Sequence, residues 1–189
     1  MRTATRSRST ESIVMAGLLC ATGIIIPMFM PKIVLEPASF TLASHVPVFI
    51  AMFISPKLAA VVCLGTTLGF FMTTPVIIAL RAASHICFAL LGAVLIRKIP
   101  EIIEKPLPST VFNGGLAFVH ALAEVAVVSP FFLAGSIFKP EQLADGYVMS
   151  VLVLVGVGTF LHSLIDYTVS IMLWKPVRAA LPSLAELRE

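Results

Sequence analysis

The sequence predicts an all-α integral membrane protein with six transmembrane helices and with its N- and C-termini in the cytoplasm. Of the 189 residues, 58% are hydrophobic and only 12% are charged, whereas a soluble domain averages about 45–50% apolar and about 25% charged residues. So few charges cannot cover the surface of a soluble domain. The apolar residues also gather in runs near the length of about 20 residues that a helix needs to cross a bilayer.

The first three spans are predicted at residues 13–31, 45–55 and 58–73. The first run is longer than the ~7–15 apolar residues of a signal peptide, so we expect it to remain as a helix. Residues 33–44 contain a proline and several polar residues and are predicted as a loop, and Ser55-Pro56-Lys57 is predicted as a turn. The second run is short, so it is either a helix that extends into the preceding loop or a re-entrant segment.

The remaining spans are predicted at residues 75–97, 109–137 and 147–174. The charged, proline-rich segment RKIPEIIEKPLP separates the fourth span from the fifth, and FKPEQLADG separates the fifth from the sixth. Both segments are predicted as loops.

The basic residues favour six spans. With the N-terminus inside, ten of the 13 lysines and arginines lie in cytoplasmic segments, two (Lys32 and Lys139) lie in outer loops, and Arg81 lies within a span. This excess of positive charge on one side is the positive-inside pattern. The predicted domains are a cytoplasmic tail at residues 1–11, a six-helix membrane domain at residues 12–178 and a cytoplasmic tail at residues 179–189.

Polar residues recur four positions apart on the last three predicted helices. A charge near the bilayer centre costs from ~2.5 to more than 10 kcal/mol, so such residues face a protein interior or a water-filled cavity. Residues four apart also share one helix face. We therefore predict a shared polar site inside the bundle. The pairs are Arg81/His85, His120/Glu124 and His162/Asp166.

These pairs also have a purely structural explanation, because polar side chains hold membrane helices together by hydrogen bonds. For His162 and Asp166 this explanation weighs as much as a functional one, and they are assigned to a possible secondary polar site. Arg81 is different, since a guanidinium stays charged and needs an anionic partner. Either Glu124 or the carboxylate of a ligand can be that partner, and we favour a ligand.

The loop PASFTLASHVP, residues 37–47, is predicted to fold over the mouth of a pocket. Phe40 offers a flat apolar face and His45 a titratable donor. The alternative is an ordinary loop in which Ser44 caps the next helix, the usual role of a serine at that place. The predicted substrate-binding residues are Arg81, His85, His120, Glu124, Phe40, His45, Ser84 and Thr41.

Common catalytic and nucleotide-binding motifs are absent from the sequence. It contains no GxxxxGK[ST], no HExxH and no GxSxG, which removes the P-loop and the commonest metalloprotease and serine-hydrolase signatures. Nothing resembles a nucleic-acid-binding module. We predict a protein that is not an enzyme and that needs partner subunits to move a solute.

The stretches PASFTLASHVPVFIAMFISPK and LRAASHICFALLGA, with the predicted topology, resemble the substrate-binding S component of energy-coupling factor (ECF) vitamin transporters over residues 10–178. The resemblance implies a multi-pass cell-membrane protein whose first loop and helices four to six hold a vitamin near the outer face. It also implies docking on a coupling membrane subunit, the T component, with two ATPases that use ATP, and no cofactor in this chain.

The same resemblance implies that the first helix docks through an AxxxA motif. The nearest matches are Ala16-xxx-Cys20 and Gly17-xxx-Ala21. Small residues at this spacing let another helix approach closely. Packing inside this chain and docking on another subunit both explain them.

The predicted vitamin is a small carboxylate, because the guanidinium fork of Arg81 matches a carboxylate. Pantothenate is favoured and nicotinate comes next, since the hydroxyl and amide groups of pantothenate would use several His and Glu partners. The alternative is an intramembrane metal-dependent enzyme or metal-ion carrier, because HxxxE and HxxxD place two metal ligands on one helix face. The fixed charge of Arg81 argues against a metal, so no metal ligand is assigned.

Overall fold

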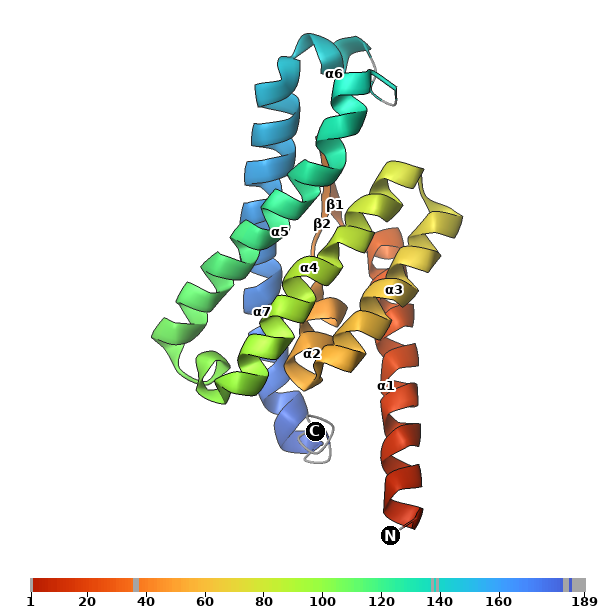
Figure 1. Cartoon of the computed structure of the whole chain (residues 1–189), viewed down its shortest axis with the longest axis vertical. Helices are drawn as coiled ribbons and strands as arrows, with labels where there is room; N and C mark the ends of the chain where they lie inside the picture. Colours follow the sequence, from red (N-terminus) through yellow and green to blue (C-terminus); the bar gives the residue numbers. More distant parts are fainter. Residues whose placement is uncertain (1, 36–37, 137, 139, 182–183, 185–189) are drawn as a thin grey trace.

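Helices make up most of the computed structural model, which describes residues 2–35, 38–136, 138, 140–181 and 184 (Figure 1). Two of the shorter elements form a β-hairpin. In chain order the elements are α1 (Arg2–Phe29), β1 (Lys32–Leu35), β2 (Ala38–Thr41), α2 (Val46–Ile54), α3 (Pro56–Thr73), α4 (Val76–Lys98), η1 (Pro100–Ile103), α5 (Pro106–Ala134), α6 (Pro140–Ala144), η2 (Val148–Val157) and α7 (Gly158–Ala180).

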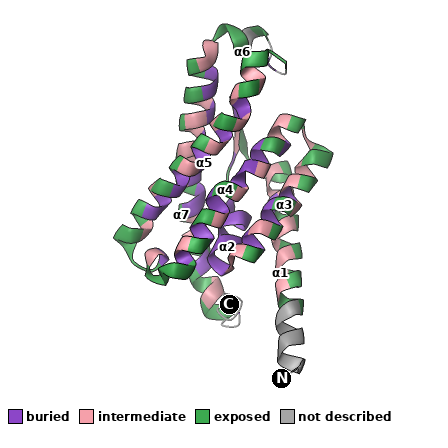
Figure 2. Cartoon of the chain, viewed as in Figure 1, coloured by how far each residue is buried: buried purple, intermediate pink, exposed green. Residues whose placement is uncertain are grey.

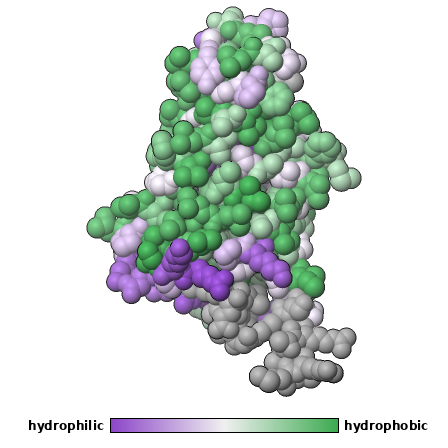
Figure 3. Space-filling view, viewed as in Figure 1, coloured by the Kyte–Doolittle hydropathy of each residue, from purple (hydrophilic) through white to green (hydrophobic). Residues whose placement is uncertain are grey.

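Among the described residues, five helices are long and apolar enough to cross a membrane: α1 from Thr10 onward, α3, α4, α5 and the continuous η2–α7 helix. Their outward side chains are apolar, and Met72 and Leu133 are 85% and 77% exposed. Figure 3 shows a broad hydrophobic band over the middle of the molecule and hydrophilic residues at its lower end. Soluble proteins rarely expose so large an apolar surface. The chain is a multi-pass membrane protein.

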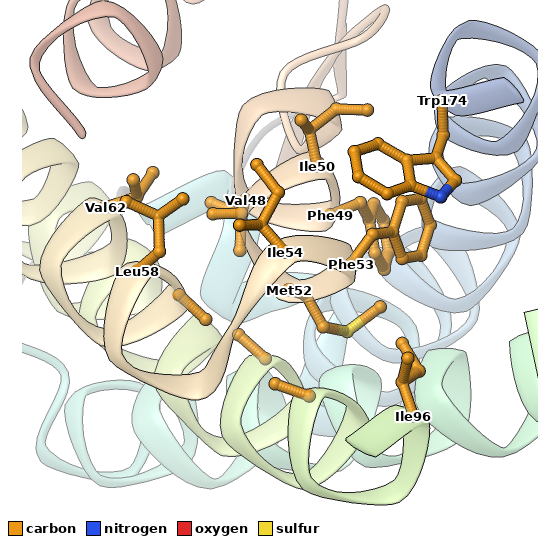
Figure 4. Packing of buried hydrophobic residues seen from close by; sticks show 14 of the residues in the cluster. Val48, Phe49, Ile50, Met52, Phe53, Ile54, Leu58, Val62, Ile96 and Trp174 are labelled. Atoms are coloured by element: carbon orange, nitrogen blue, oxygen red, sulfur yellow. The ribbon is translucent and has the colours of Figure 1, made fainter. Parts of the chain in front are cut away.

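Helix α2 corresponds to the second predicted helix, residues 45–55, and it lies inside the bundle. Nine residues span only about 14 Å at 1.5 Å per residue, and the hydrocarbon core of a bilayer is about 30 Å thick. All nine residues are buried, and the helix contacts α1, α3, α4 and α7 (Figures 2 and 4). The helix predicted at residues 45–55 is therefore present with nearly the predicted bounds, but it is a core element too short to cross the membrane alone.

The other helices form a continuous row around α2, in which α1 contacts α3, α3 contacts α4, α4 contacts α5 and α5 contacts α7. Apolar side chains of α2 such as Phe49, Met52 and Phe53 point outward toward the neighbouring helices (Figure 4). Gly92 of α4 allows the approach, because a Cβ there would meet Met52 Sδ. The start of α1 and the end of α7 lie at the same end of the molecule (Figure 1). Which side of the membrane that end faces stays a prediction.

The segment predicted as a loop at residues 33–44 is mostly a β-hairpin. Strands β1 and β2 pair antiparallel, with Lys32 opposite Thr41 and Leu35 opposite Ala38. The β-branched run Ile33-Val34 favours a strand, but so short a pair gives little signal in a sequence dominated by helices. A tight turn at residues 42–45 follows and leads directly into α2.

Several helix boundaries also differ from the predicted ones. Helix α1 begins at Arg2, inside the predicted N-terminal tail, and α7 continues to Ala180 instead of ending at residue 174. The ten residues of η2 form a π-helix, a wider helix that hydropathy cannot reveal. Ser55 caps α3 by accepting a hydrogen bond from the Leu58 N–H at 3.2 Å, and Gly135 ends α5 with a left-handed φ of 62°.

Candidate functional site

A cavity of about 150 Å³ lies beneath the β-hairpin, between α1, α3, α4, α5 and α7. Its walls combine charged, polar and aromatic side chains. The polar lining residues are Lys32, Ser39, Thr41, Ser44, His45, Thr66, Thr74, Arg81, His85, Glu124, Thr159 and His162, and the larger apolar ones are Phe40, Val48, Phe70 and Ile78. An apolar cavity with several charged and polar side chains in its wall is the arrangement expected of a binding site for a small solute.

A buried ion pair joins α4 to α5 at one wall. Arg81 donates from Nε and Nη2 to Glu124 Oε2, at 2.9 and 2.7 Å. Thr159 of α7 donates to the same oxygen at 2.7 Å. The exposed fractions of Arg81 and Glu124 are only 8% and 3%. One carboxylate oxygen therefore ties three helices together.

The second oxygen of Glu124 faces two histidines. Oε1 lies 3.5 Å from His85 Nε2 and 3.4 Å from His120 Nε2. Both ring nitrogens are buried and have no hydrogen-bond partner among the described residues. The other ring nitrogen of His120, Nδ1, is 3.2 Å from Ser163 Oγ.

Asp166 holds the turn that covers the cavity. Its Oδ1 accepts a hydrogen bond from the Ala43 N–H at 2.9 Å. Its Oδ2 accepts one from the His45 N–H at 2.9 Å and lies 3.0 Å from His45 Nδ1. Ala43 has a φ of 66°, a conformation that costs an L-residue roughly 1–2 kcal/mol. Charge-assisted bonds to a fully buried carboxylate offset that cost.

His45 stands at the centre of the four histidines. Its ring centroid is 4.6 Å from that of His85, 4.7 Å from that of His120 and 4.9 Å from that of His162. His162 Nε2 is 3.1 Å from Ser44 Oγ. The role of Ser44 is therefore not that of a helix cap: His45 occupies the N-cap position of α2, without a side-chain capping bond.

Phe40 covers the cavity from the hairpin. Its ring centroid is 5.5 Å from that of His162, and it rests against Gly158 at the start of α7. A Cβ at Gly158 would lie 2.9 Å from Phe40 Cε2 and closer to Cζ. The absence of a side chain at this position lets the aromatic ring reach the site.

The structure brings almost all of the predicted site residues together. Glu124, one of the two anionic partners predicted for Arg81, makes that contact. The possible secondary site of His162 and Asp166 belongs to the same cluster, because Asp166 bonds His45. Two of the predicted residues do not line the cavity. The Ser84 hydroxyl donates to the Arg81 carbonyl of its own helix at 2.7 Å, and His120 lies in the histidine cluster without reaching the cavity wall.

Two residues of the site, Thr159 and Ser163, were not predicted. Thr159 lies three residues before His162, and Ser163 lies three residues before Asp166. That i, i+3 spacing places them on the same face and was the available signal. Lys32 was assigned to an outer loop only for its charge, yet it lines the cavity.

The two candidate docking pairs of α1 face different ways. Ala16 and Cys20 pack against the hydrophobic core, and the Cys20 thiol lies 3.8 Å from the Val61 carbonyl of α3. Gly17 and Ala21 are exposed, and a Cβ at Gly17 would meet no atom within 4 Å. Internal packing thus accounts for the first pair but not for the second.

An apolar helical bundle around a cavity lined by both polar and apolar side chains is the architecture expected of a membrane protein that binds a small solute. Over 182 aligned residues, the chain is 39% identical to the niacin transporter NiaX of Lactococcus lactis subsp. cremoris (strain MG1363). The alignment covers 95% of this chain and 80% of the relative. No family model and no solved structure matches the chain.

The chain belongs to the substrate-binding S components of ECF vitamin transporters. It is a transport protein and not an enzyme. As an S component it works in vitamin uptake together with a T component and ATPases.

Proposed function

We propose that this chain captures niacin from outside the cell and delivers it inward after docking on a T component and two ATPases. The observation that carries the proposal is the cavity of about 150 Å³ with the buried Arg81 in its wall. The name of the relative, a niacin transporter, supports the same vitamin.

The size of the cavity favours a single small ring. In another protein, a cavity of about 150 Å³ accommodates benzene. Niacin is one six-membered pyridine ring with a carboxylate, so its ring is matched in size. Phe40 offers an aromatic face on the hairpin side of the cavity.

Arg81 has donors left for the carboxylate of niacin. A guanidinium carries five N–H donors, and two of them bond Glu124 among the described contacts. The remaining donors suit an anionic ligand, and Lys32 adds a second cation to the lining. Arg81 can therefore hold Glu124 and a ligand carboxylate together.

The preference for pantothenate gains no support from the relative. The preference for pantothenate requires that the His and Glu side chains are free to bind the hydroxyl and amide groups of this longer acid. In the structure, Glu124 bonds Arg81 and Thr159, and His45 bonds Asp166. Two of the groups counted as ligand partners, Glu124 and His45, are therefore already engaged within the chain, which favours an acid that needs fewer polar partners.

The proposal is tested by calorimetric titration of the detergent-purified protein with niacin and, separately, with pantothenate. We expect niacin to bind at about one molecule per chain and pantothenate to bind at least about 100-fold more weakly, a difference of ~2.8 kcal/mol. Tighter binding of pantothenate would contradict the assignment of the vitamin but not the family.

We further propose that the exposed Gly17/Ala21 face of α1 docks on the T component. Gly17→Leu would block close helix approach, so we expect niacin uptake by cells expressing the whole transporter to fall at least about tenfold, or ~1.4 kcal/mol. Niacin binding by the isolated chain should stay unchanged. Gly115→Leu, the same substitution at an exposed glycine of α5 where an added Cβ also meets no atom within 4 Å, is the matched control. Unchanged uptake by Gly17→Leu would exclude this face.

A further inference from the structure

We propose that His45, His85, His120 and Glu124 form a binding site for one divalent transition-metal ion of the zinc class. The four residues come from the turn before α2, from α4 and from α5. One nitrogen or oxygen atom from each lies within 4.8 Å of those of the other three. The inference concerns metal binding by the apo chain and does not depend on which vitamin the cavity takes.

The distances around Glu124 Oε1 fit a metal site. Zinc binds histidine nitrogen at ~2.0–2.1 Å and carboxylate oxygen at ~2.0–2.2 Å in a tetrahedron, so its ligand atoms lie about 3.4 Å from one another. The Oε1 atom is 3.4 Å from His120 Nε2 and 3.5 Å from His85 Nε2. These distances are long for hydrogen bonds but match the edges of a coordination tetrahedron.

The two histidine nitrogens point to a ligand for a second reason. His120 is fully buried and His85 is 7% exposed, yet neither Nε2 atom has a hydrogen-bond partner among the described residues. Burying a polar group without a partner is unfavourable, because its hydrogen bonds to water are lost and not replaced. A metal ion between them would satisfy both nitrogens at once.

The outer contacts of the ligands are those of a metal site. A histidine that binds a metal usually donates its other ring N–H to a carboxylate or another oxygen. His45 Nδ1 is 3.0 Å from Asp166 Oδ2, and His120 Nδ1 is 3.2 Å from Ser163 Oγ. Both contacts leave the Nε2 atoms for a metal. The far oxygen of Glu124 is likewise held by Arg81 and Thr159.

The buried charges also favour a cation. Arg81 contributes one positive charge, and Glu124 and Asp166 contribute two negative ones, so the buried cluster is negative overall when its histidines are neutral. From the sequence, Arg81 argued against a metal. In the structure Glu124 Oε2 balances that charge and turns its other oxygen toward the histidines.

A second group, His45, His162 and Asp166, is also compact, but it is the weaker candidate. Asp166 Oδ2 already accepts the His45 backbone N–H and contacts His45 Nδ1. His162 Nε2 already contacts Ser44 Oγ. These contacts leave fewer free ligand atoms than the first group offers.

The test is metal binding by the full-length protein in detergent, stripped with EDTA and then incubated with ZnCl₂ or CoCl₂. We expect about one zinc ion per chain by mass spectrometry, and a strong visible d–d absorption with cobalt, the signature of a tetrahedral site. No bound zinc together with no tetrahedral cobalt spectrum in the wild-type protein would overturn the proposal, whatever the variants do.

Single-residue variants test which histidines bind the zinc ion. His120→Gln and His85→Gln should each weaken zinc binding by at least about tenfold, the lower end of the effect of disturbing a metal site. His162→Gln, a histidine of the same cavity, is the matched control and should retain zinc. Loss of zinc in His162→Gln with retention in the other two would overturn the assignment, since it would move the ion to the second group. Titrating each protein with niacin separates a failed metal site from a failed vitamin assignment.

Discussion

Arg81→Met is expected to remove niacin binding and to destabilise the protein. The substitution leaves the Glu124 carboxylate buried without its cation, and breaking a buried ion pair costs about 3–5 kcal/mol. It also removes the donors proposed for the niacin carboxylate, so affinity should fall by more than about 100-fold, or ~2.8 kcal/mol. Calorimetry measures the affinity and thermal unfolding in detergent measures the stability. Arg97→Met, on an exposed position of the same helix, should change neither.

The double variant Arg81→Met/Glu124→Gln separates the two effects of Arg81. Removing both charges eliminates the unpaired carboxylate, so we expect most of the lost stability to return. Niacin binding should stay absent because the carboxylate of the vitamin still lacks its partner. Recovery of niacin binding in the double variant would show that Arg81 supports the fold and does not contact the vitamin.

Asp166→Ala is expected to have the second-largest effect, through the turn that covers the cavity. Asp166 accepts the Ala43 and His45 backbone N–H groups and contacts His45 Nδ1. Hydrogen bonds to charged groups contribute about 1.5–3 kcal/mol each, so we expect a loss of at least about 3 kcal/mol in stability. Without these bonds nothing offsets the left-handed conformation of Ala43, and niacin affinity should fall with the loss of the ordered turn.

Limited proteolysis reports on that turn, and calorimetry reports on niacin binding. In Asp166→Ala we expect faster cleavage within residues 38–45 together with weaker niacin binding. The control is Asp145→Ala, which removes an exposed carboxylate from the segment before η2 and should behave like the wild type. Wild-type cleavage and affinity in Asp166→Ala would mean that the turn is held by its own backbone bonds.

The sequence predicts the helices of this fold well because hydropathy reports on them directly. The prediction fails for elements whose structure is not determined by hydropathy. Helix α2 was predicted as a membrane span because all its residues are apolar. In the structure these residues pack against neighbouring helices and not against lipid. The strands β1 and β2 pair only with each other, and four-residue strands carry too short a pattern to identify.

The candidate site was predictable to the extent that its residues repeat at helical spacing. Arg81, His85, His120 and Glu124 stand out because polar residues are rare within apolar runs. The bond between His45 and Asp166 joins residues 121 positions apart, and only the tertiary path of the turn across α7 brings them together. The size of the cavity depends on which polar groups bond one another, so the choice between two small acids lay beyond the sequence.

The most direct test of the central claim, that the cavity recognises the carboxylate of niacin, is the calorimetric affinity of the wild-type protein for nicotinamide relative to niacin. The two molecules share the pyridine ring and differ only in an amide or a carboxylate. A hydrogen bond to a charged group contributes about 1.5–3 kcal/mol, so we expect nicotinamide to bind at least about tenfold more weakly. Equal affinities for the two would contradict carboxylate recognition by Arg81.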